Sequence, residues 1–142
     1  MLDLNLELRQ GSFTLQGPLT LEQPVTGLLG PSGCGKSTLL RTIAGLAHPQ
    51  TGHISLNGEI LFDAQRGIHL PPHRRRVGLV FQDSQLFPHL SVEHNLLYGF
   101  KLLPPTQRRF TLAQILDLLD IGCLLQRRPR HLSGGERQRV AL

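Results

Sequence analysis

Nine residues in the first third of the chain, GPSGCGKST at positions 30–38, have the types and spacing of a loop that binds phosphate. They fit the pattern G-x-x-x-x-G-K-[ST] and lie between an apolar run and a helix-compatible segment, as the chemistry requires. Glycine permits backbone conformations that are closed to bulkier residues, so the N–H groups can turn inward around a β- or γ-phosphate. The residues predicted to hold a nucleotide are Gly30, Pro31, Ser32, Gly33, Cys34, Gly35, Lys36, Ser37 and Thr38.

Each polar group of this loop has a predicted role. The ammonium of Lys36 supplies a mobile positive charge for the β- and γ-oxygens, and the positive end of the helix that starts there adds to it. The Ser37 hydroxyl is placed to coordinate Mg²⁺, which neutralises the same oxygens, and Thr38 is expected to contact the α-phosphate. The alternative is a glycine-rich turn that matches by chance, but the flanking strand and helix favour the functional interpretation.

A second segment near the end of the chain, LSGGE at 132–136, has the pattern of a capped helix start. Ser133 is a good N-cap residue, and Glu136 stands three positions later, as in a capping box. Gly134 and Gly135 would leave the first backbone amides open, which makes the segment a second candidate anion site. An ordinary capped helix without a ligand is the alternative interpretation.

Short strands are predicted for the part of the chain around the phosphate loop. Residues 2–8 and 13–16 alternate apolar and polar side chains, as half-buried strands do. The apolar runs 25–29 and 77–81 are predicted to be short strands, the latter buried. A helix is expected over 36–46, and the dipeptide Asn57-Gly58 predicts a hairpin turn.

Beyond position 82 the pattern becomes helical. Ser91 is a candidate N-cap for a helix over 92–98, and Thr106 is the expected cap of a helix whose apolar stripe is formed by Leu112, Ile115, Leu116 and Leu119. We therefore divide the chain into a core with the phosphate loop at 1–82, a helical subdomain at 83–132, and the segment that starts the last helix at 133–142; the family resemblance given below makes these the ATP-binding core and the signature segment.

Composition excludes several classes of protein. The chain has 142 residues, 39% of them hydrophobic, and no run approaches the roughly 18 apolar residues that span a bilayer. Its two cysteines, Cys34 and Cys123, form no CxxC pair, so neither a disulfide framework nor a zinc site is expected. The net charge of +5 comes largely from short basic runs without interleaved aromatic residues, which we interpret as solvated faces or protein contacts. Electrostatic attraction toward a nucleotide or a membrane surface is the alternative.

Three motifs in order identify a family. The loop at 30–38, the motif VFQ at 80–82 and the segment LSGGERQR at 132–139 together resemble the ABC ATPases over essentially the whole chain. The resemblance implies an α/β fold of the P-loop NTPase class, with an N-terminal antiparallel β region and a helical subdomain. It also implies that Gln82 is the Q-loop glutamine, which contacts Mg²⁺ and the attacking water.

The resemblance further implies partners. In ABC proteins two ATP-binding subunits pair head to tail, and the signature of one closes over ATP held by the other, so Ser133, Gly134, Gly135 and Glu136 are expected to act in trans. Residues 83–99 fall where family members contact a transmembrane permease, with Phe87, Leu90 and Val92 as candidate groove residues or local core residues. A substrate-binding protein is expected indirectly, nucleic acid is not, and the expected location is the cytoplasmic face of the inner membrane.

The stretch 56–99 is most similar to the ATPase subunits of molybdate importers. Sulfate, polyamine, iron and sugar importers share much of this stretch and remain alternatives. ABC ATPases that act on DNA are a further alternative, but they insert long coiled coils or zinc modules between phosphate loop and signature. Gln82 and Ser133 lie only 51 positions apart, without heptads or a CxxC pair.

The chain departs from the family pattern in two places. No aromatic residue lies at 9–11, where adenine stacking is expected, and the alternation of its strand predicts that Phe13 is a core residue. The Walker B strand with its catalytic glutamate is not found, so the C-terminal half of the cassette is expected to be missing. Asp63 and Asp120 imitate Walker B only faintly, and no histidine is assigned a catalytic role. We expect weak ATP binding and negligible hydrolysis from these residues alone.

Overall fold

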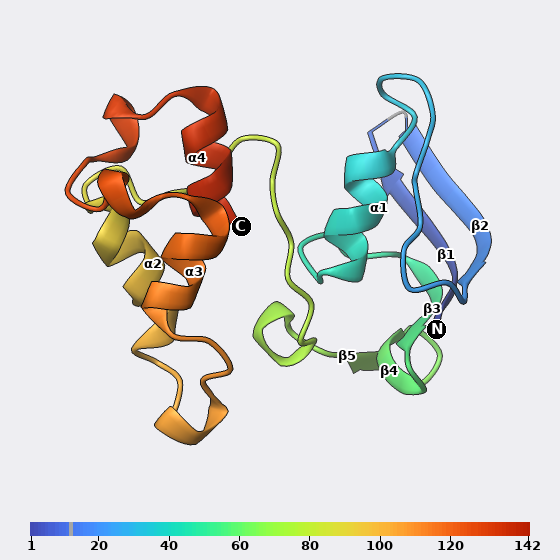
Figure 1. Cartoon of the computed structure of the whole chain (residues 1–142). Coiled ribbons are helices and arrows are strands. Elements are labelled where there is room, and N and C mark those ends of the chain that lie inside the picture. The colour runs from blue at the N-terminus through green and yellow to red at the C-terminus, as the bar shows by residue number, and fades with distance from the viewer. Residues whose placement is uncertain (12) are drawn as a thin grey trace. The chain divides into compact units, whose positions relative to one another are not determined.

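The computed structural model describes residues 1–11 and 13–142, and these divide into two units, Met1–Leu79 and Val80–Leu142. Within the described residues, the first unit contains five strands and one α-helix, and the second contains three α-helices (Figure 1). The elements are β1 (Leu2–Gln10), β2 (Phe13–Leu21), α1 (Lys36–Ile43), β3 (Thr51–Leu56), β4 (Glu59–Asp63), β5 (Ile68–His69), α2 (Val92–Phe100), α3 (Leu112–Leu119) and α4 (Gly134–Ala141). Short 3₁₀ turns lie at Pro72–Arg74, Pro105–Gln107, Gly122–Leu124 and Pro129–His131.

The first unit is built on an antiparallel sheet with the strand order β2-β1-β3-β4-β5. Both alternating runs near the N-terminus are strands, as predicted, and they extend further than the pattern indicated. In β2 exposure alternates strictly along the strand, which is the period of a sheet with one covered face. The expected antiparallel β region is therefore confirmed.

Leucines on one face of β1 form the core together with α1. Leu4, Leu6 and Leu8 are almost fully buried and cluster with Leu39 of the helix and Ile54 of β3. Figure 1 shows α1 lying beside the strands of the first unit. Because the leucines recur at every second position, a one-residue slip in the pairing of β1 would turn all of them to water.

The predicted hairpin is present between β3 and β4. Asn57 and Gly58 have φ values of 49° and 84°, the left-handed conformation that a type I′ turn requires at both central residues. The hairpin register shifts between Ile54 and Ser55, where the ladder is irregular. Asn and Gly tolerate positive φ better than other residues do, which is why this dipeptide predicted the hairpin correctly.

Two predicted strands are wrong. The runs 25–29 and 77–81 form no strand, and in the first run Val25 and Leu29 are 88% and 93% exposed. An apolar run becomes a buried strand only when neighbouring strands satisfy its backbone on both sides. Neither run has such a neighbour among the described residues, so composition alone was a misleading guide.

The second unit packs its helices around a small apolar cluster. Val92 of α2 and Val140 of α4 are buried with Ile121, Leu124 and Leu132. The N-cap of α2 is Ser91, as predicted, and its side chain accepts a hydrogen bond from the His94 N–H. In the described part of the chain, every helix is too short or too polar to cross a membrane.

The predicted cap of α3 is wrong. Thr106 lies inside the 3₁₀ turn Pro105–Gln107, and Thr111 caps the helix instead. Thr111 and Gln114 form a capping box, with the Gln114 side chain returning to the Thr111 N–H at 2.8 Å. Because Pro104 and Pro105 hold the chain in a separate turn, the helix starts five residues later than expected.

Asp3 and His53 form a contact on the face of the sheet opposite Leu4, and we expect acid to weaken it. The Asp3 carboxylate lies 2.9 Å from His53 Nε2 and accepts a hydrogen bond from Thr20 Oγ1. The hydrogen bond with His53, then that from Thr20, lowers the pKa of Asp3. A pKa lowered on folding means stability that is present above the unfolded pKa and is lost as pH falls through the folded one. The Asp3→Asn variant should therefore lose less thermal stability than the parent chain between pH 5 and pH 3.

The control for this pH experiment is Glu59→Gln in the same unit, at an exposed position of β4. It should follow the parent chain in a series of melting curves measured across the acid range. A parent and an Asp3→Asn variant that lose stability equally on acidification would contradict the interpretation.

Candidate functional site

The Lys36 side chain closes the phosphate loop on itself. Its Nζ donates to the Gly30 and Pro31 carbonyls, both at 2.7 Å, and lies 3.6 Å from the Cys34 sulfur. An ammonium carries three donors, and the loop uses all three, the third in a long hydrogen bond to the Cys34 sulfur, so a phosphate oxygen would bind by replacing that sulfur. The loop therefore presents its positive charge at the start of α1, as the motif predicted.

Glycines in the loop take the conformations for which they were predicted. Gly33 and Gly35 have φ values of 82° and 93°, in the left-handed region that side chains rarely adopt. Gly35 is also the N-cap of α1, and the first turn of the helix carries no acidic residue. The amides at this helix start are thus free of competing carboxylates and suit an anion.

Phe13 is the residue at this site that sequence reasoning undervalued. It lies on the same inward face of β2 as Leu15, in agreement with its strand pattern, but it is only half-buried. Its ring lies directly against Gly35, where an added Cβ would overlap Phe13 Cζ and lie 3.1 Å from Cε1. Strand alternation gave the direction of Phe13, but no local signal could show that its ring reaches a loop 22 positions away.

The two hydroxyls that follow Lys36 differ in exposure. Ser37 is exposed, which suits a group predicted to coordinate Mg²⁺, and Thr38 is half-buried. The carbonyl of Thr38 accepts a hydrogen bond from the buried Thr42 hydroxyl at 2.7 Å, one turn further along α1. This donor set of hydroxyl, ammonium and backbone amides fits a triphosphate with its magnesium ion.

The signature segment folds as its pattern predicted. Ser133 caps α4, and the capping box is complete in both directions: Ser133 N–H donates to Glu136 at 2.6 Å, and Glu136 N–H donates to Ser133 Oγ at 3.2 Å. The backbone hydrogen bond from Ser133 is the main reason that the pKa of Glu136 is lowered. Gly134 and Gly135 are exposed, so this helix start is accessible to an external anion.

Gln82 lies in the second unit and lines the same hollow as the signature helix. This pocket has a volume of about 320 Å³ and is lined by Gln82, Asp83, Ser84, Gly134, Arg137 and Gln138. A second pocket, of about 550 Å³, belongs to the first unit. The structure therefore brings the predicted Q-loop glutamine together with Gly134. Gln82 and Ser37 belong to different units, and their shared Mg²⁺ contact stays a prediction.

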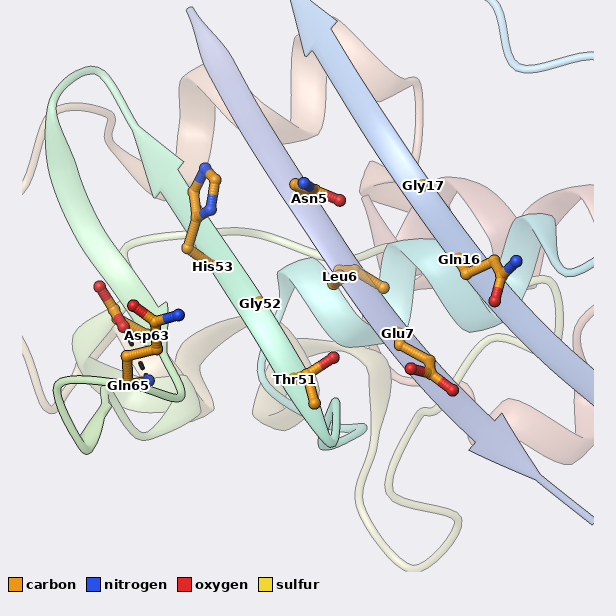
Figure 2. A pocket seen from close by; sticks show the side chains of 10 residues that line it. All are labelled: Asn5, Leu6, Glu7, Gln16, Gly17, Thr51, Gly52, His53, Asp63 and Gln65. Carbon is orange, nitrogen blue, oxygen red and sulfur yellow. Dashed lines mark hydrogen bonds between the residues drawn. The ribbon is translucent and has the colours of Figure 1, made fainter.

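The 550 Å³ pocket lies on the outer face of the sheet (Figure 2). Its floor is the backbone of a row of three paired residues, Gly17, Leu6 and Gly52, where no side chain rises on this side. The side chains of Asn5 and His53 lie on one side of this row, and the side chain of Glu7 lies on the other side (Figure 2). The carboxylates of Glu7 and Asp63 line this pocket and disfavour a polyphosphate there.

The two carboxylates that imitate Walker B have structural roles. Asp63 accepts hydrogen bonds from the Gln65 and Arg66 amides in the turn after β4, both at 3.0 Å. Asp120 ends α3 in the left-handed conformation, with φ of 50°. Among the residues outside position 12, no group of three or more His, Cys, Asp or Glu could hold a metal ion.

Comparison with known proteins gives concordant results. Residues 19–142 match the family model described as "ABC transporter". The chain is 52% identical over 142 residues to the "Molybdenum import ATP-binding protein ModC" of Paramagnetospirillum magneticum, covering 100% of this chain and 39% of that protein. The protein of the same name from Mesorhizobium japonicum is 49% identical over 134 residues, covering 94% of this chain and 36% of its own length. The chain thus spans about two-fifths of the length of these relatives.

Solved structures show the same architecture. The structure of cbiO1 from Clostridium perfringens, described as "Part of the ABC transporter complex cbiONQ", superposes with a TM-score of 0.74 and 29% identity, over 99% of this chain and 58% of that one. The dimeric structure of a post-hydrolysis state of the ATP-binding cassette MJ0796, bound to ADP and Pi, gives a TM-score of 0.77 and 25% identity, over 99% and 67% of the two chains.

Proposed function

We propose, because this chain belongs to the ABC transporter family, that it is the ATP-binding part of an importer subunit that couples ATP binding and hydrolysis to uptake of an oxyanion. Molybdate is the proposed oxyanion, since relatives about half identical to this chain are named as molybdenum import proteins. The observation that carries the proposal is the Lys36 ammonium, held at the start of α1 by the Gly30 and Pro31 carbonyls. This arrangement places a positive charge at a helix N-terminus, and a triphosphate would take over the donor that now contacts the Cys34 sulfur.

ATP would be bound by groups that the loop already orients. Backbone amides of 33–38 surround the β- and γ-phosphates, and Lys36 contacts their oxygens. Mg²⁺, held by Ser37 and by Gln82, would neutralise the same oxygens when it is bound. We expect binding rather than turnover from these residues alone, since a carboxylate general base has not been identified among them.

The signature segment would complete the site of a second subunit. Ser133, Gly134, Gly135 and Glu136 would face the γ-phosphate held by the partner in a head-to-tail dimer. The complete capping box supports this, because it holds the helix start rigid while Gly134 and Gly135 stay exposed. The similar cassette MJ0796 forms a dimer in its complex with ADP and Pi, which supports the same assembly here.

Residues 83–99 would contact the transmembrane permease at the cytoplasmic face of the inner membrane. Phe87 is 39% exposed and stacks against Tyr98 with ring centroids 4.5 Å apart, so it remains a candidate contact. Val92 is fully buried and is a core residue instead. An apolar groove of about 380 Å³ on α2 and α3 begins within the same segment, at Leu96 and Leu97, and would extend the contact. A substrate-binding protein would act on the permease from the other side.

Cys34 provides a direct test of nucleotide binding. Both cysteines are exposed, and the Cys34 sulfur lies beside the Lys36 ammonium. In a Cys123→Ser chain, where Cys34 is the remaining thiol, saturating Mg·ATP should slow alkylation by N-ethylmaleimide about tenfold or more. The measurement is the alkylation rate by mass spectrometry, with and without nucleotide.

The matched control is a Cys34→Ser chain, in which only Cys123 reacts and ATP should change nothing. AMP lacks the polyphosphate and should protect Cys34 far less than ATP does. Equal alkylation of Cys34 with and without saturating Mg·ATP would refute nucleotide binding at this loop.

A further inference from the structure

Arg75 is a buried arginine that joins two segments of the first unit. It is 1% exposed and directly follows the 3₁₀ turn Pro72–Arg74. Its Nε donates to the Leu70 carbonyl at 2.8 Å, and its Nη1 donates to the Thr42 and Ile43 carbonyls at 2.9 and 3.0 Å. The side chain thus connects the segment after β5 to the last turn of α1.

The last turn of a helix is a suitable place for this group. Its final carbonyls have no partner within the helix, and they form the negative end of the helix dipole. A guanidinium satisfies several of them at once because its donors lie in a rigid plane. Arg75 therefore caps the end of α1 opposite to the phosphate loop.

The guanidinium of Arg75 is a buried positive charge without a carboxylate partner among the described residues, which is an energetically unfavourable state. Among the ion pairs of the described residues none includes Arg75, and its Nη2 has no hydrogen-bond acceptor there. Burial lowers the pKa of its guanidinium. A buried charge without a carboxylate is expensive, so its carbonyl contacts carry the whole compensation.

Gly45 is shaped for the same contact. It follows α1 with φ of 84°, and an added Cβ would lie 2.7 Å from Arg75 Nε and 2.9 Å from Cζ. Any side chain at this position would push the guanidinium away from the helix end. Gly45 and Arg75 therefore form one arrangement, although they are 30 positions apart.

We propose that Arg75 is a positioning residue for ATP, which acts by holding the far end of α1 so that Lys36 and Ser37 keep their orientation. The inference rests on the proposed function of the phosphate loop. A helix of eight residues is about 12 Å long, so a tilt of about 5° around its C-terminal end moves the loop by about 1 Å. A misplacement of about 1 Å can cost about 100-fold in the rate of an oriented reaction, and we expect it to weaken the hydrogen bonds that hold ATP as well.

The test compares Mg·ATP affinity among variants, at a temperature where all of them are folded. Arg75→Lys keeps the charge, but a single ammonium cannot replace the fork that reaches Leu70, Thr42 and Ile43. Its dissociation constant for Mg·ATP should rise about tenfold. Gly45→Ala keeps the arginine but displaces its guanidinium and also strains the backbone at the end of α1, so it should weaken binding in the same direction. Titrations with a fluorescent ATP analogue measure both effects.

Two controls separate positioning from general stability. Arg74→Lys makes the same change at the adjacent exposed arginine, and Ile54→Val loosens the buried core of β3. Both should bind Mg·ATP like the parent chain, even though Ile54→Val lowers the melting temperature. If Arg75→Lys binds like the parent, or weakens only as far as Ile54→Val does, the positioning role is refuted. A parent chain that binds no Mg·ATP would instead refute the proposed function.

Discussion

Replacing Lys36 by alanine should weaken Mg·ATP binding about 100-fold or more, because it removes the ammonium that we propose contacts the polyphosphate. The side chain also holds the loop closed through the Gly30 and Pro31 carbonyls, both at 2.7 Å. The variant therefore loses a charge-assisted contact and also the shape of the loop that surrounds it. Isothermal titration of the purified variant with Mg·ATP measures the loss.

Lys101 provides the matched control for this substitution. It is the chain's other lysine and lies in the second unit, at the C-terminal end of α2. The Lys101→Ala variant changes the net charge by the same amount and should bind Mg·ATP within about twofold of the parent, because an exposed surface charge is screened by salt. Undiminished binding by Lys36→Ala would show that the nucleotide is held elsewhere.

Among glycine-to-alanine substitutions in the first unit, Gly52→Ala should lower the free energy of unfolding most. Gly52 has φ of 97°, and an added Cβ would overlap the Asn5 carbonyl oxygen and lie 2.7 Å from Leu6 Cα. Both are backbone atoms of β1, which is paired on both edges and cannot move aside cheaply. Backbone strain and overlap together should cost about 3 kcal/mol or more in the free energy of unfolding. Thermal or urea unfolding measures this value.

Gly58→Ala is the control that separates steric overlap from backbone strain. It has a similar φ of 84°, but an added Cβ would meet no atom within 4 Å. The Gly58→Ala variant should therefore lose only the conformational part, about 1 kcal/mol. Equal destabilisation by the two substitutions would mean that the crowding at Gly52 has no energetic consequence.

Local patterns predicted most of the individual elements. The alternation of Leu4, Leu6 and Leu8, the Asn57-Gly58 turn, and the caps Ser91 and Ser133 are all present as expected. Each of these depends on neighbours a few positions away, so a short stretch of sequence contains the information. The position of the phosphate loop was predictable for the same reason.

Patterns that need distant partners were less reliable. The apolar runs 25–29 and 77–81 have strand composition but no strand neighbours among the described residues, and they remain without regular structure. Thr106 had the right type for a cap, yet the adjacent prolines placed it in a different turn. Val92 could be read as a surface residue or a core residue until its packing against Ile121 was known.

Residue types and spacing were sufficient to assign the family and to predict the helices that start at Lys36 and after Ser133, because those motifs are contiguous. Residue types and spacing did not predict which distant residues lie next to one another. Phe13 against Gly35, Gln82 beside Gly134, and Arg75 at the end of α1 all join residues separated by 22 to 52 positions. Such contacts arise only when the sheet and the helices have packed, since burial and hydrogen bonding between distant segments, rather than local propensity, select them.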